Sequence, residues 1–271
     1  MKPEFLVSIN NLNELEEYKK VGFSTFLFPL QNFTIGYPNT FNIEDIPYDG
    51  YILINRILDC KDVDDLKTIL KSINIKGIIF EDIAVFNIVK ELNLKIELIW
   101  WGNHFGTNPE IINFYLEKGI DSAFISTDIT KGETLSIVEN SIKPLVLPVF
   151  GLNQIMYSRR LLMTNYCKYF NIQSIKEEML AEEKSNIKFR IYEDDKGTVI
   201  FNNNIYNGLE LLPIPNIKYF YINTAFIDKD IIIELFKNID NKNFDINSLE
   251  IETDNGFLDK KTIYKLNEVS K

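Results

Sequence analysis

The chain has 271 residues, of which 45% are hydrophobic, and its 39 acidic against 29 basic residues give it a formal charge of −10. Such a surface repels phosphate backbones, so we expect nucleic acid to be bound only through a partner or a local basic patch. The two cysteines, Cys60 and Cys167, lie far apart in the sequence. Two distant thiols cannot bind zinc or an iron–sulfur cluster unaided, so neither a metal nor a cofactor is expected.

The sequence carries no signal for export or membrane insertion. Its first residues, MKPEFLVSINNLNELEEY, have too short an apolar run for a signal peptide. A membrane-spanning helix requires about 18 consecutive apolar residues, and no such run occurs. Unpaired cysteines are typical of a reducing compartment. The sequence therefore predicts a soluble, cytoplasmic protein.

Short apolar runs alternate with helical patterns along most of the chain. The apolar runs predict strands at 4–9, 24–30, 50–56, 76–82, 95–101, 122–128, 144–151 and 218–226. The helical patterns lie at 12–20, 61–72, 83–92, 108–118, 130–141, 158–170 and 229–239. Repeated strand–helix units predict parallel strands joined by right-handed crossovers. Eight strands in about 250 residues predict an α/β fold of the (β/α)₈ TIM-barrel type.

One segment interrupts this alternation. Residues 187–212 alternate like a strand, turn at EDDKG and alternate again, which predicts a β-hairpin at 187–206, between the seventh helix and the eighth strand. We expect residues 1–240 to form the barrel, with the hairpin as an insertion. We expect residues 241–271 to form a C-terminal cap, with a short strand at 249–253 and a helix at 259–269.

The seventh strand is followed by a polar cluster. In PLVLPVFGLNQIMYSRRLLMTNY (144–166), an apolar run closes on a glycine, and the cluster that follows is Tyr157, Ser158, Arg159 and Arg160. Ser158 is expected to cap the helix at 158–170, so that 151–160 is a strand-to-helix loop at the end of the barrel where ligands bind. The two guanidinium groups are candidates for binding a carboxylate or phosphate. A solvated first helical turn with surface salt bridges explains them equally well.

Other strand ends supply further candidates. The only histidine, His104, lies in WWGNHFG after the fifth strand and is a candidate general base, although a loop packed by aromatic side chains is the alternative. Glu81 and Asp82 close the fourth strand, where neighbouring side chains point in different directions, and Glu81 is favoured to face the ligand. Four more residues are candidates by position alone: Asn55, Arg56, Thr127 and Asp128.

The end of the seventh strand also carries a family pattern. Phe150, Gly151, Tyr157 and Ser158 are followed by LLMTNY (161–166) and then by the expected hairpin. In this order the chain resembles the U32 peptidase-like family, once described as collagenase-type proteases. Strand seven of that family ends roughly in His-Gly-x-x-Cys-x-x-Tyr-Ser-Gly-x-Cys. The resemblance covers residues 1 to about 240 and implies a TIM-type barrel.

The chain departs from the family at two places. Gln154 and Leu161 stand where longer relatives have cluster-binding cysteines, and the later cysteine-rich segment of those relatives is missing. Asn223, Thr224 and Ala225 stand where the family usually has Glu-Gly-Arg. A carboxylate and a guanidinium suited to gripping a substrate are therefore absent, and Asn223 is retained as a candidate ligand-binding residue.

Members of the family are implicated in hydroxylation of RNA bases, notably 5-hydroxyuridine in tRNA, often as pairs of proteins. The resemblance therefore implies a cluster-free partner in such a system, which binds a small anionic ligand or a second U32 protein. Two alternatives stay open. A peptidase is one, although the sequence shows no zincin helix, nucleophile elbow or paired aspartates. A barrel that binds without catalysing is the other, and the lost Glu-Gly-Arg favours it.

Overall fold

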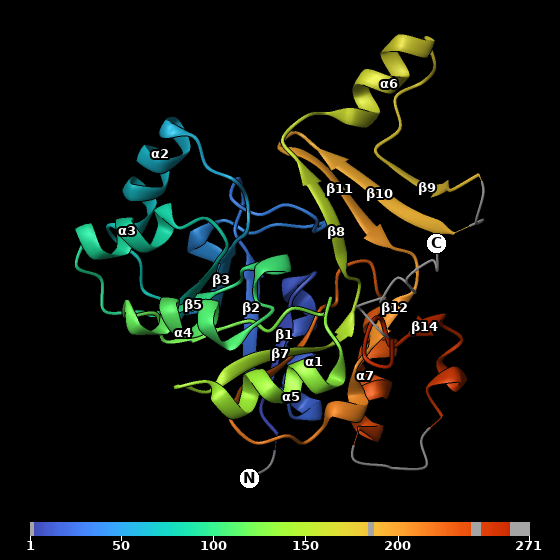
Figure 1. Cartoon of the computed structure of the whole chain (residues 1–271). Helices are drawn as coiled ribbons and strands as arrows, with labels where there is room; N and C mark the ends of the chain where they lie inside the picture. The colour runs from blue at the N-terminus through green and yellow to red at the C-terminus, as the bar shows by residue number, and fades with distance from the viewer. Residues whose placement is uncertain (1–2, 184–186, 240–244, 261–271) are drawn as a thin grey trace, which may run out of the picture.

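The computed structural model describes residues 3–183, 187–239 and 245–260. These residues form a mixed α/β fold with two sheets (Figure 1). The larger sheet has ten strands in the order β14-β12-β7-β13-β1-β2-β3-β4-β5-β6, is mostly parallel and is curled. The smaller sheet has four antiparallel strands in the order β8-β11-β10-β9.

Each predicted strand is present, although most are shorter than expected. The larger sheet consists of β1 (Phe5–Ser8), β2 (Thr25–Pro29), β3 (Tyr51–Ile54), β4 (Gly77–Phe80), β5 (Glu97–Trp100), β6 (Ser122–Ala123), β7 (Leu145–Gly151), β12 (Ile205–Asn207), β13 (Ile217–Ile222) and β14 (Thr253–Asp254). The smaller sheet consists of β8 (Gln154–Ser158), β9 (Glu177–Ala181), β10 (Lys188–Asp194) and β11 (Gly197–Asn202).

The described helices also follow the predicted pattern. They are α1 (Leu15–Val21), α2 (Cys60–Leu70), α3 (Ala84–Glu91), α4 (Pro109–Glu117), α5 (Lys131–Asn140), α6 (Leu162–Phe170) and α7 (Lys229–Asn238). Short 3₁₀ helices lie at Leu12–Glu14, Ile43–Asp45, Asn103–Phe105, Leu209–Leu211 and Ile246–Leu249. No helix in the described part of the chain is long and apolar enough to cross a membrane.

The apolar strands are buried on both faces, which explains why they do not alternate with polar residues. In β3, Tyr51 and Leu53 point into a cluster that gathers side chains from strands all around the curled sheet. Ile52 and Ile54 point the other way, into a second cluster shared with the surrounding helices. Successive side chains of a strand point to opposite faces, so a continuous apolar run fills both layers.

The two ends of the parallel run come into contact. The expected sixth strand at 122–128 is a strand only at Ser122–Ala123, and beyond it Phe124 forms an isolated parallel bridge with Val146 of β7. The amide of Ile125 donates to the carbonyl of Val146 at 2.9 Å. The sheet therefore curls far enough for β6 to meet β7.

The structure corrects the predicted helix at 158–170. Ser158 is the last residue of β8, which pairs with β11, and the helix begins only at Leu162. The hydroxyl of Ser158 does not cap this helix but accepts from the amide of Arg160 at 3.1 Å. The prediction was wrong because β11, the strand that pairs with the segment containing Ser158, comes much later in the sequence. Local patterns do not reveal such a distant partner.

The smaller sheet and α6 form a projection from the larger sheet. The predicted hairpin is present as β10 and β11, but it belongs to the four-stranded sheet, and residues 205–207 pair with β7 instead. α6 contacts β11 and lies at the far end of this sheet, at the top of Figure 1, rather than beside the larger sheet. The expectation that α6 is the seventh barrel helix is therefore wrong.

The described part of the C-terminal segment packs on the larger sheet. The expected strand at 249–253 is displaced to β14, which pairs in parallel with β12. Leu258 is buried, and its carbonyl accepts from the amide of Lys131 at 3.0 Å. The helix expected at 259–269 lies almost entirely outside the described residues.

Candidate functional site

A cavity opens at the carboxyl ends of the parallel strands. Its polar lining comes from residues just beyond these strands and from the start of β8, among them Asn55, Glu81, Thr127, Gln154 and Asn223. About 50 Å³ of it is open to water-sized molecules. In parallel α/β folds this end of the strands is where ligands bind. Four of the sequence-predicted site residues, Asn55, Glu81, Thr127 and Asn223, therefore lie together in one place.

Aromatic side chains complete the walls of the cavity. The hydroxyls of Tyr37 and Tyr221 are 2.7 Å apart and buried, and burial raises the pKa of both phenols. The ring of Trp101 stacks on Phe124, with centroids 4.5 Å apart, and meets Tyr221 edge to face at 5.4 Å. Sequence patterns missed Tyr37 because it comes from an irregular loop. Trp101 and Tyr221 stand within or beside predicted strands, where strand-end position is the signal that points to them.

The two asparagines hold the cavity wall through the backbone. The amide group of Asn55 accepts from the amide of Ile35 at 2.9 Å and donates to the Ile35 carbonyl at 3.1 Å. The side chain of Asn223 donates to the Leu152 carbonyl at 3.1 Å and accepts from the amide of Ala225 at 3.1 Å. Both side chains thus fix loops that border the cavity.

Glu81 is a residue of the cavity wall whose carboxyl group has a raised pKa. Removal from water raises its pKa to about 7 from the usual 4.5, the charge of His104 opposes this shift and the neighbouring Asp82 adds to it. The Glu81 carboxyl makes no side-chain hydrogen bond among the described residues. It also borders an adjoining groove lined by Arg56 and Trp100. A carboxyl with these properties changes its protonation near neutral pH.

His104 stands beside this carboxyl but does not line the cavity. It lies in the short helix Asn103–Phe105, and its Nδ1 contacts the carboxylate of Asp128. The two side chains are 42% and 39% exposed, so the pair faces solvent. Three strand ends thus bring Glu81, His104 and Asp128 into one neighbourhood, and Asp128 had been a candidate by position alone. A carboxylate partner of this kind orients an imidazole.

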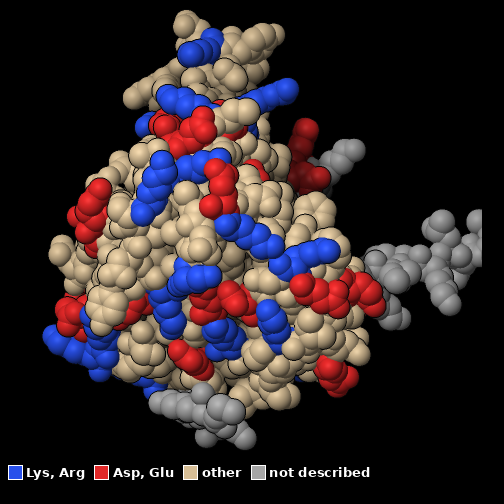
Figure 2. Space-filling model, turned by 90° about the vertical axis from the view of Figure 1, so that its left-hand side faces the viewer, with Lys and Arg blue, Asp and Glu red and all other residues tan. Residues whose placement is uncertain are grey.

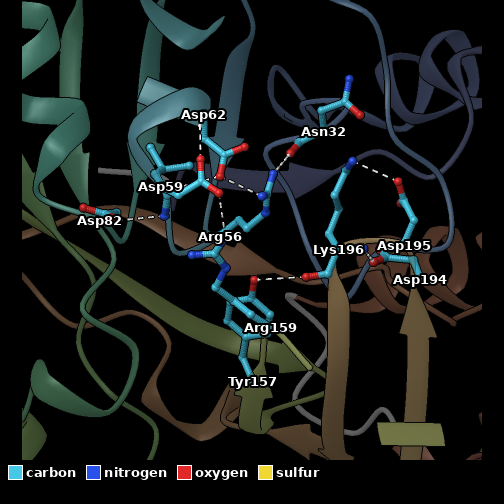
Figure 3. Close-up of polar contacts among 11 residues, drawn as sticks. Asn32, Arg56, Asp59, Asp62, Asp82, Tyr157, Arg159, Asp194, Asp195 and Lys196 are labelled. Atoms are coloured by element: carbon cyan, nitrogen blue, oxygen red, sulfur yellow. Dashed lines mark hydrogen bonds and ion pairs between the residues drawn. The ribbon is translucent and has the colours of Figure 1, made fainter. Parts of the chain in front are cut away.

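The predicted anion-binding arginines lie elsewhere, and Figure 3 shows the first of them, Arg159. Arg159 donates to the carboxylate of Asp59, the N-cap of α2, at 2.8 Å and is 42% exposed. Arg160 is exposed, and its carbonyl accepts from the hydroxyl of Thr198 at 2.8 Å. β8 carries both residues away from the cavity toward α6. They therefore do not line the cavity with Glu81.

Arg56, which was a candidate by its strand-end position alone, is buried in the group of polar side chains that Figure 3 shows. The guanidinium of Arg56 donates to the carbonyl of Asn32 at 2.6 Å and to Asp62 at 2.7 Å. The hydroxyl of Tyr157 donates to the carbonyl of Lys196, in the β10–β11 turn, at 3.4 Å. Figure 3 shows these side chains where the loop after β3 meets the tip of the four-stranded sheet. The ion pair at the N-cap of α2 is the contact of this cluster that joins the projection to the rest of the chain.

The described residues do not assemble a hydrolytic or metal-binding constellation. No group of three or more His, Cys, Asp or Glu side chains in this part of the chain is arranged to hold a metal ion. The ring of His104 contacts Asp128, whereas the hydroxyl of Ser158 accepts from the amide of Arg160 on the other sheet. The Ser–His pair that nucleophilic catalysis needs is not formed by these two residues.

One comparison of the sequence identifies a family, and a second finds a relative that aligns over most of the chain. The model of peptidase family U32 matches residues 46–214. A relative from Bacillus subtilis (strain 168), named tRNA hydroxylation protein P2, is 26% identical over 259 residues, which cover 87% of this chain and 84% of that protein.

Solved structures show a looser likeness. The U32 peptidase Mk0906 is 12% identical with a TM-score of 0.49, over 82% of this chain and 93% of that one. A chitinase from Chromobacterium violaceum ATCC 12472 is 9% identical with a TM-score of 0.44, over 88% and 99% of the two chains. The family match spans well over half of the sequence, including the strand-seven motif, the hairpin and five of the parallel strands, β3 to β7. The chain belongs to peptidase family U32.

Proposed function

We propose that this U32 protein takes part in the hydroxylation of tRNA, at uridine to give 5-hydroxyuridine, in the cytoplasm and together with a second protein of the family. The name of the Bacillus subtilis relative supports the tRNA-hydroxylation role, because the two sequences align over most of both chains. The chain has only two cysteines, far apart in the sequence, and these are too few to bind an iron–sulfur cluster. This supports the need for a partner protein.

The site that we assign to this function is the cavity at the strand ends. We propose that the contact between Phe124 and Val146 closes the eight parallel strands into a (β/α)₈ barrel, with the four-stranded sheet inserted between β7 and β13. The parallel bridge at Phe124 and the hydrogen bond from Ile125 to the Val146 carbonyl support this closure. The cavity then lies at the mouth of the barrel, where the loops of all eight strands converge.

One observation carries the assignment of chemistry. Glu81 lines the cavity, its carboxyl makes no hydrogen bond among the described residues, and its pKa is about 7. Such a carboxyl is available both as a proton acceptor and as a proton donor at physiological pH. His104 lies near Glu81 and acts to lower its pKa, while Asp128 orients the His104 ring. We assign Glu81 as the acid–base group and His104 as its neighbour that tunes the proton affinity.

A second candidate function is a barrel that binds without catalysing. The observation in its favour is that the residues that replace Glu-Gly-Arg form hydrogen bonds with the backbone of the chain itself. The hydroxyl of Thr224 donates to the carbonyl of Ser8 at 2.9 Å, and Asn223 donates to the carbonyl of Leu152. These side chains fasten the backbone and leave no charged group at this place to grip a substrate.

The test is a deletion of the gene followed by mass spectrometry of nucleosides from total tRNA. We expect 5-hydroxyuridine and its derivatives to fall in the deletion strain and to return when the full chain is expressed. A Glu81→Gln variant separates the two candidates. Loss of modification with normal protein levels supports a catalytic cavity, and full modification supports a barrel that binds only. An unchanged 5-hydroxyuridine level in the deletion strain would refute the role in tRNA hydroxylation.

A further inference from the structure

The helix α6 presents an unusual outer face. Only Met163 and Cys167 of this helix are buried, where it meets the four-stranded sheet. Three aromatic side chains point outward: Tyr166 is 55% exposed, Tyr169 is 83% exposed and Phe170 is 56% exposed. Their rings form one group, because the Phe170 ring centroid is 4.7 Å from that of Tyr166 and 4.9 Å from that of Tyr169. Soluble proteins rarely expose contiguous apolar surface of this kind without a binding role.

The segment that carries these rings has basic but no acidic residues. Residues 140–176 contain no Asp or Glu, although the whole chain has 39 of them. Within the same stretch, the exposed basic residues of α6 and its flanks are Arg159, Arg160, Lys168 and Lys176. The next acidic residue in the sequence, Glu177, pairs with Arg190. Figure 2 shows the tip of the projection as mostly uncharged surface that carries basic side chains, with acidic side chains beginning below it.

The projection holds this face in a fixed position. The carboxylate of Glu193, which is 2% exposed, accepts from the amides of Met163 and Thr164 at 2.7 and 2.9 Å. It also accepts from the hydroxyl of Thr198 at 2.6 Å. A buried carboxylate that accepts several hydrogen bonds holds the start of α6 rigidly against the four-stranded sheet. The aromatic face of α6 is therefore preorganised for binding.

The aromatic face and the cavity are linked by one strand. β8 begins at Gln154, which lines the cavity, and ends at Ser158, immediately before the two arginines. A strand rises about 3.3 Å per residue, so the arginines stand roughly 15–20 Å from the cavity. A chain molecule that contacts α6 can therefore extend along β8 toward the cavity.

We propose that the outer face of α6, with Arg159 and Arg160, is a binding surface for single-stranded RNA. The rings of Tyr166, Tyr169 and Phe170 stack on unpaired bases, and the basic side chains contact the phosphates. Stacking on exposed aromatic side chains and charge contact with the backbone are the two ways in which proteins hold single strands. The inference rests on the proposed function, because it supplies the surface that brings an unpaired loop of tRNA to the cavity.

Charge complementarity favours RNA over a protein partner. The chain as a whole repels phosphate, so a stretch that carries arginine and lysine and is free of acids is the local exception that RNA binding requires. A protein partner does not require the removal of every acidic residue, since interfaces use both signs of charge at their rims.

The experiment uses the full chain and a fluorescein-labelled 17-nucleotide RNA stem-loop with a seven-nucleotide unpaired loop, followed by fluorescence anisotropy. Tyr169→Ala is expected to weaken binding about tenfold, because stacking on one base is lost. Tyr169→Trp should retain the affinity, because it keeps an aromatic face. Tyr48→Ala is the matched control, since Tyr48 is 72% exposed in a loop outside the projection. Tyr48→Ala should bind like the wild type.

The charge contacts have their own variants. Arg160→Ala and Lys168→Ala should each weaken binding and reduce its dependence on salt, whereas Lys20→Ala on α1, also exposed, should do neither. Wild-type protein that does not bind the stem-loop, or Tyr169→Ala that binds like the wild type, would overturn the proposal. Loss of a U32 partner on affinity purification of Tyr169→Ala, with RNA affinity unchanged, would make the surface a protein interface instead.

This assay does not depend on tRNA modification, so the two proposals fail separately. RNA binding that depends on α6, in a protein whose deletion leaves 5-hydroxyuridine unchanged, contradicts the proposed function alone. Loss of 5-hydroxyuridine on deletion, with RNA binding insensitive to the α6 variants, contradicts the RNA-binding surface alone.

Discussion

The hydroxyl of Tyr37 lies 2.7 Å from the hydroxyl of Tyr221, in the wall of the cavity. The first tyrosine comes from the irregular loop after β2 and the second from β13, so the contact joins segments from opposite ends of the chain. Both side chains are buried. The pair therefore fixes the loop that borders the site to the sheet that carries it.

Removal of one hydroxyl of this pair should destabilise the protein. Tyr37→Phe and Tyr221→Phe are each expected to lower the free energy of unfolding by about 1 kcal/mol, because the remaining buried hydroxyl loses a partner. The double variant should lose less than the sum of the two, since no orphan hydroxyl remains. Urea unfolding of the four proteins measures the coupling. Strictly additive losses would mean that the two hydroxyls do not stabilise each other.

The raised pKa of Glu81 predicts a pH dependence of stability. The folded-state pKa of about 7 lies above the usual 4.5, so the unfolded chain releases this proton first as the pH rises. The contribution of Glu81 to stability is therefore full below pH 4.5, declines up to about pH 7 and stays constant above it. Glu81→Gln should remove this decline and raise the free energy of unfolding above pH 7 by up to about 3 kcal/mol.

Urea unfolding of the wild type and Glu81→Gln at a series of pH values tests this prediction. Glu139→Gln on α5, an exposed position, is the control and should follow the wild type. A difference between the wild type and Glu81→Gln that stays the same from pH 5 to pH 8 would show that Glu81 is an ordinary solvated carboxyl.

Glu193 should stabilise the projection with the opposite pH dependence. Burial raises its pKa, but hydrogen bonds from Thr164, Thr198 and the amide of Met163 outweigh burial and hold the pKa below its usual value. Its contribution is therefore present above the usual pKa of 4.5 and is lost as the pH falls below it.

Glu193→Gln should weaken the attachment of α6 by about 2 kcal/mol at neutral pH, because hydrogen bonds to a charged acceptor are replaced by neutral ones. Hydrogen exchange of the α6 amides measures this attachment. Faster exchange confined to the projection is the expected result. Unchanged protection of α6 would show that its packing against β11 is sufficient without the carboxylate.

The sequence predicted the parts of the fold that depend on local pattern. Each apolar run became a strand, because burial on both faces demands a continuous apolar segment wherever it lies in the chain. The strand-end rule likewise placed Asn55, Glu81 and Asn223 at the cavity, since parallel strands deliver their carboxyl ends to one edge.

The sequence could not predict what depends on distant partners. Residues 154–158 form a strand because β11 pairs with them, and α6 is capped by Glu193 of β10 rather than by Ser158. This pairing carries Arg159 and Arg160 away from the cavity that they were expected to line. The part played by Tyr37 was equally hidden, because its partner Tyr221 is far away in the sequence.

The buried guanidinium of Arg56 should matter for stability more than the exposed one of Arg159. Arg56→Met removes the guanidinium donor from the carboxylate of Asp62 and the carbonyl of Asn32 and should cost about 3 kcal/mol. Arg56→Lys keeps the charge but not the planar guanidinium group, so its loss of stability should lie between those of Arg56→Met and Arg159→Met. Arg159→Met, at a surface pair, should cost less than about 1 kcal/mol. Chemical unfolding ranks the three variants, and an equal loss for Arg56→Met and Arg159→Met would contradict this ranking.

The central claim is that this U32 protein supports tRNA hydroxylation through the carboxyl group of Glu81. The most direct measurement is the amount of 5-hydroxyuridine in total tRNA from the deletion strain, expressing wild type, Glu81→Gln or the Glu139→Gln control at matched protein levels. We predict full modification with the wild type and the control, and at least a tenfold loss with Glu81→Gln, because a neutral amide cannot exchange a proton. Wild-type levels of 5-hydroxyuridine with Glu81→Gln would contradict the claim.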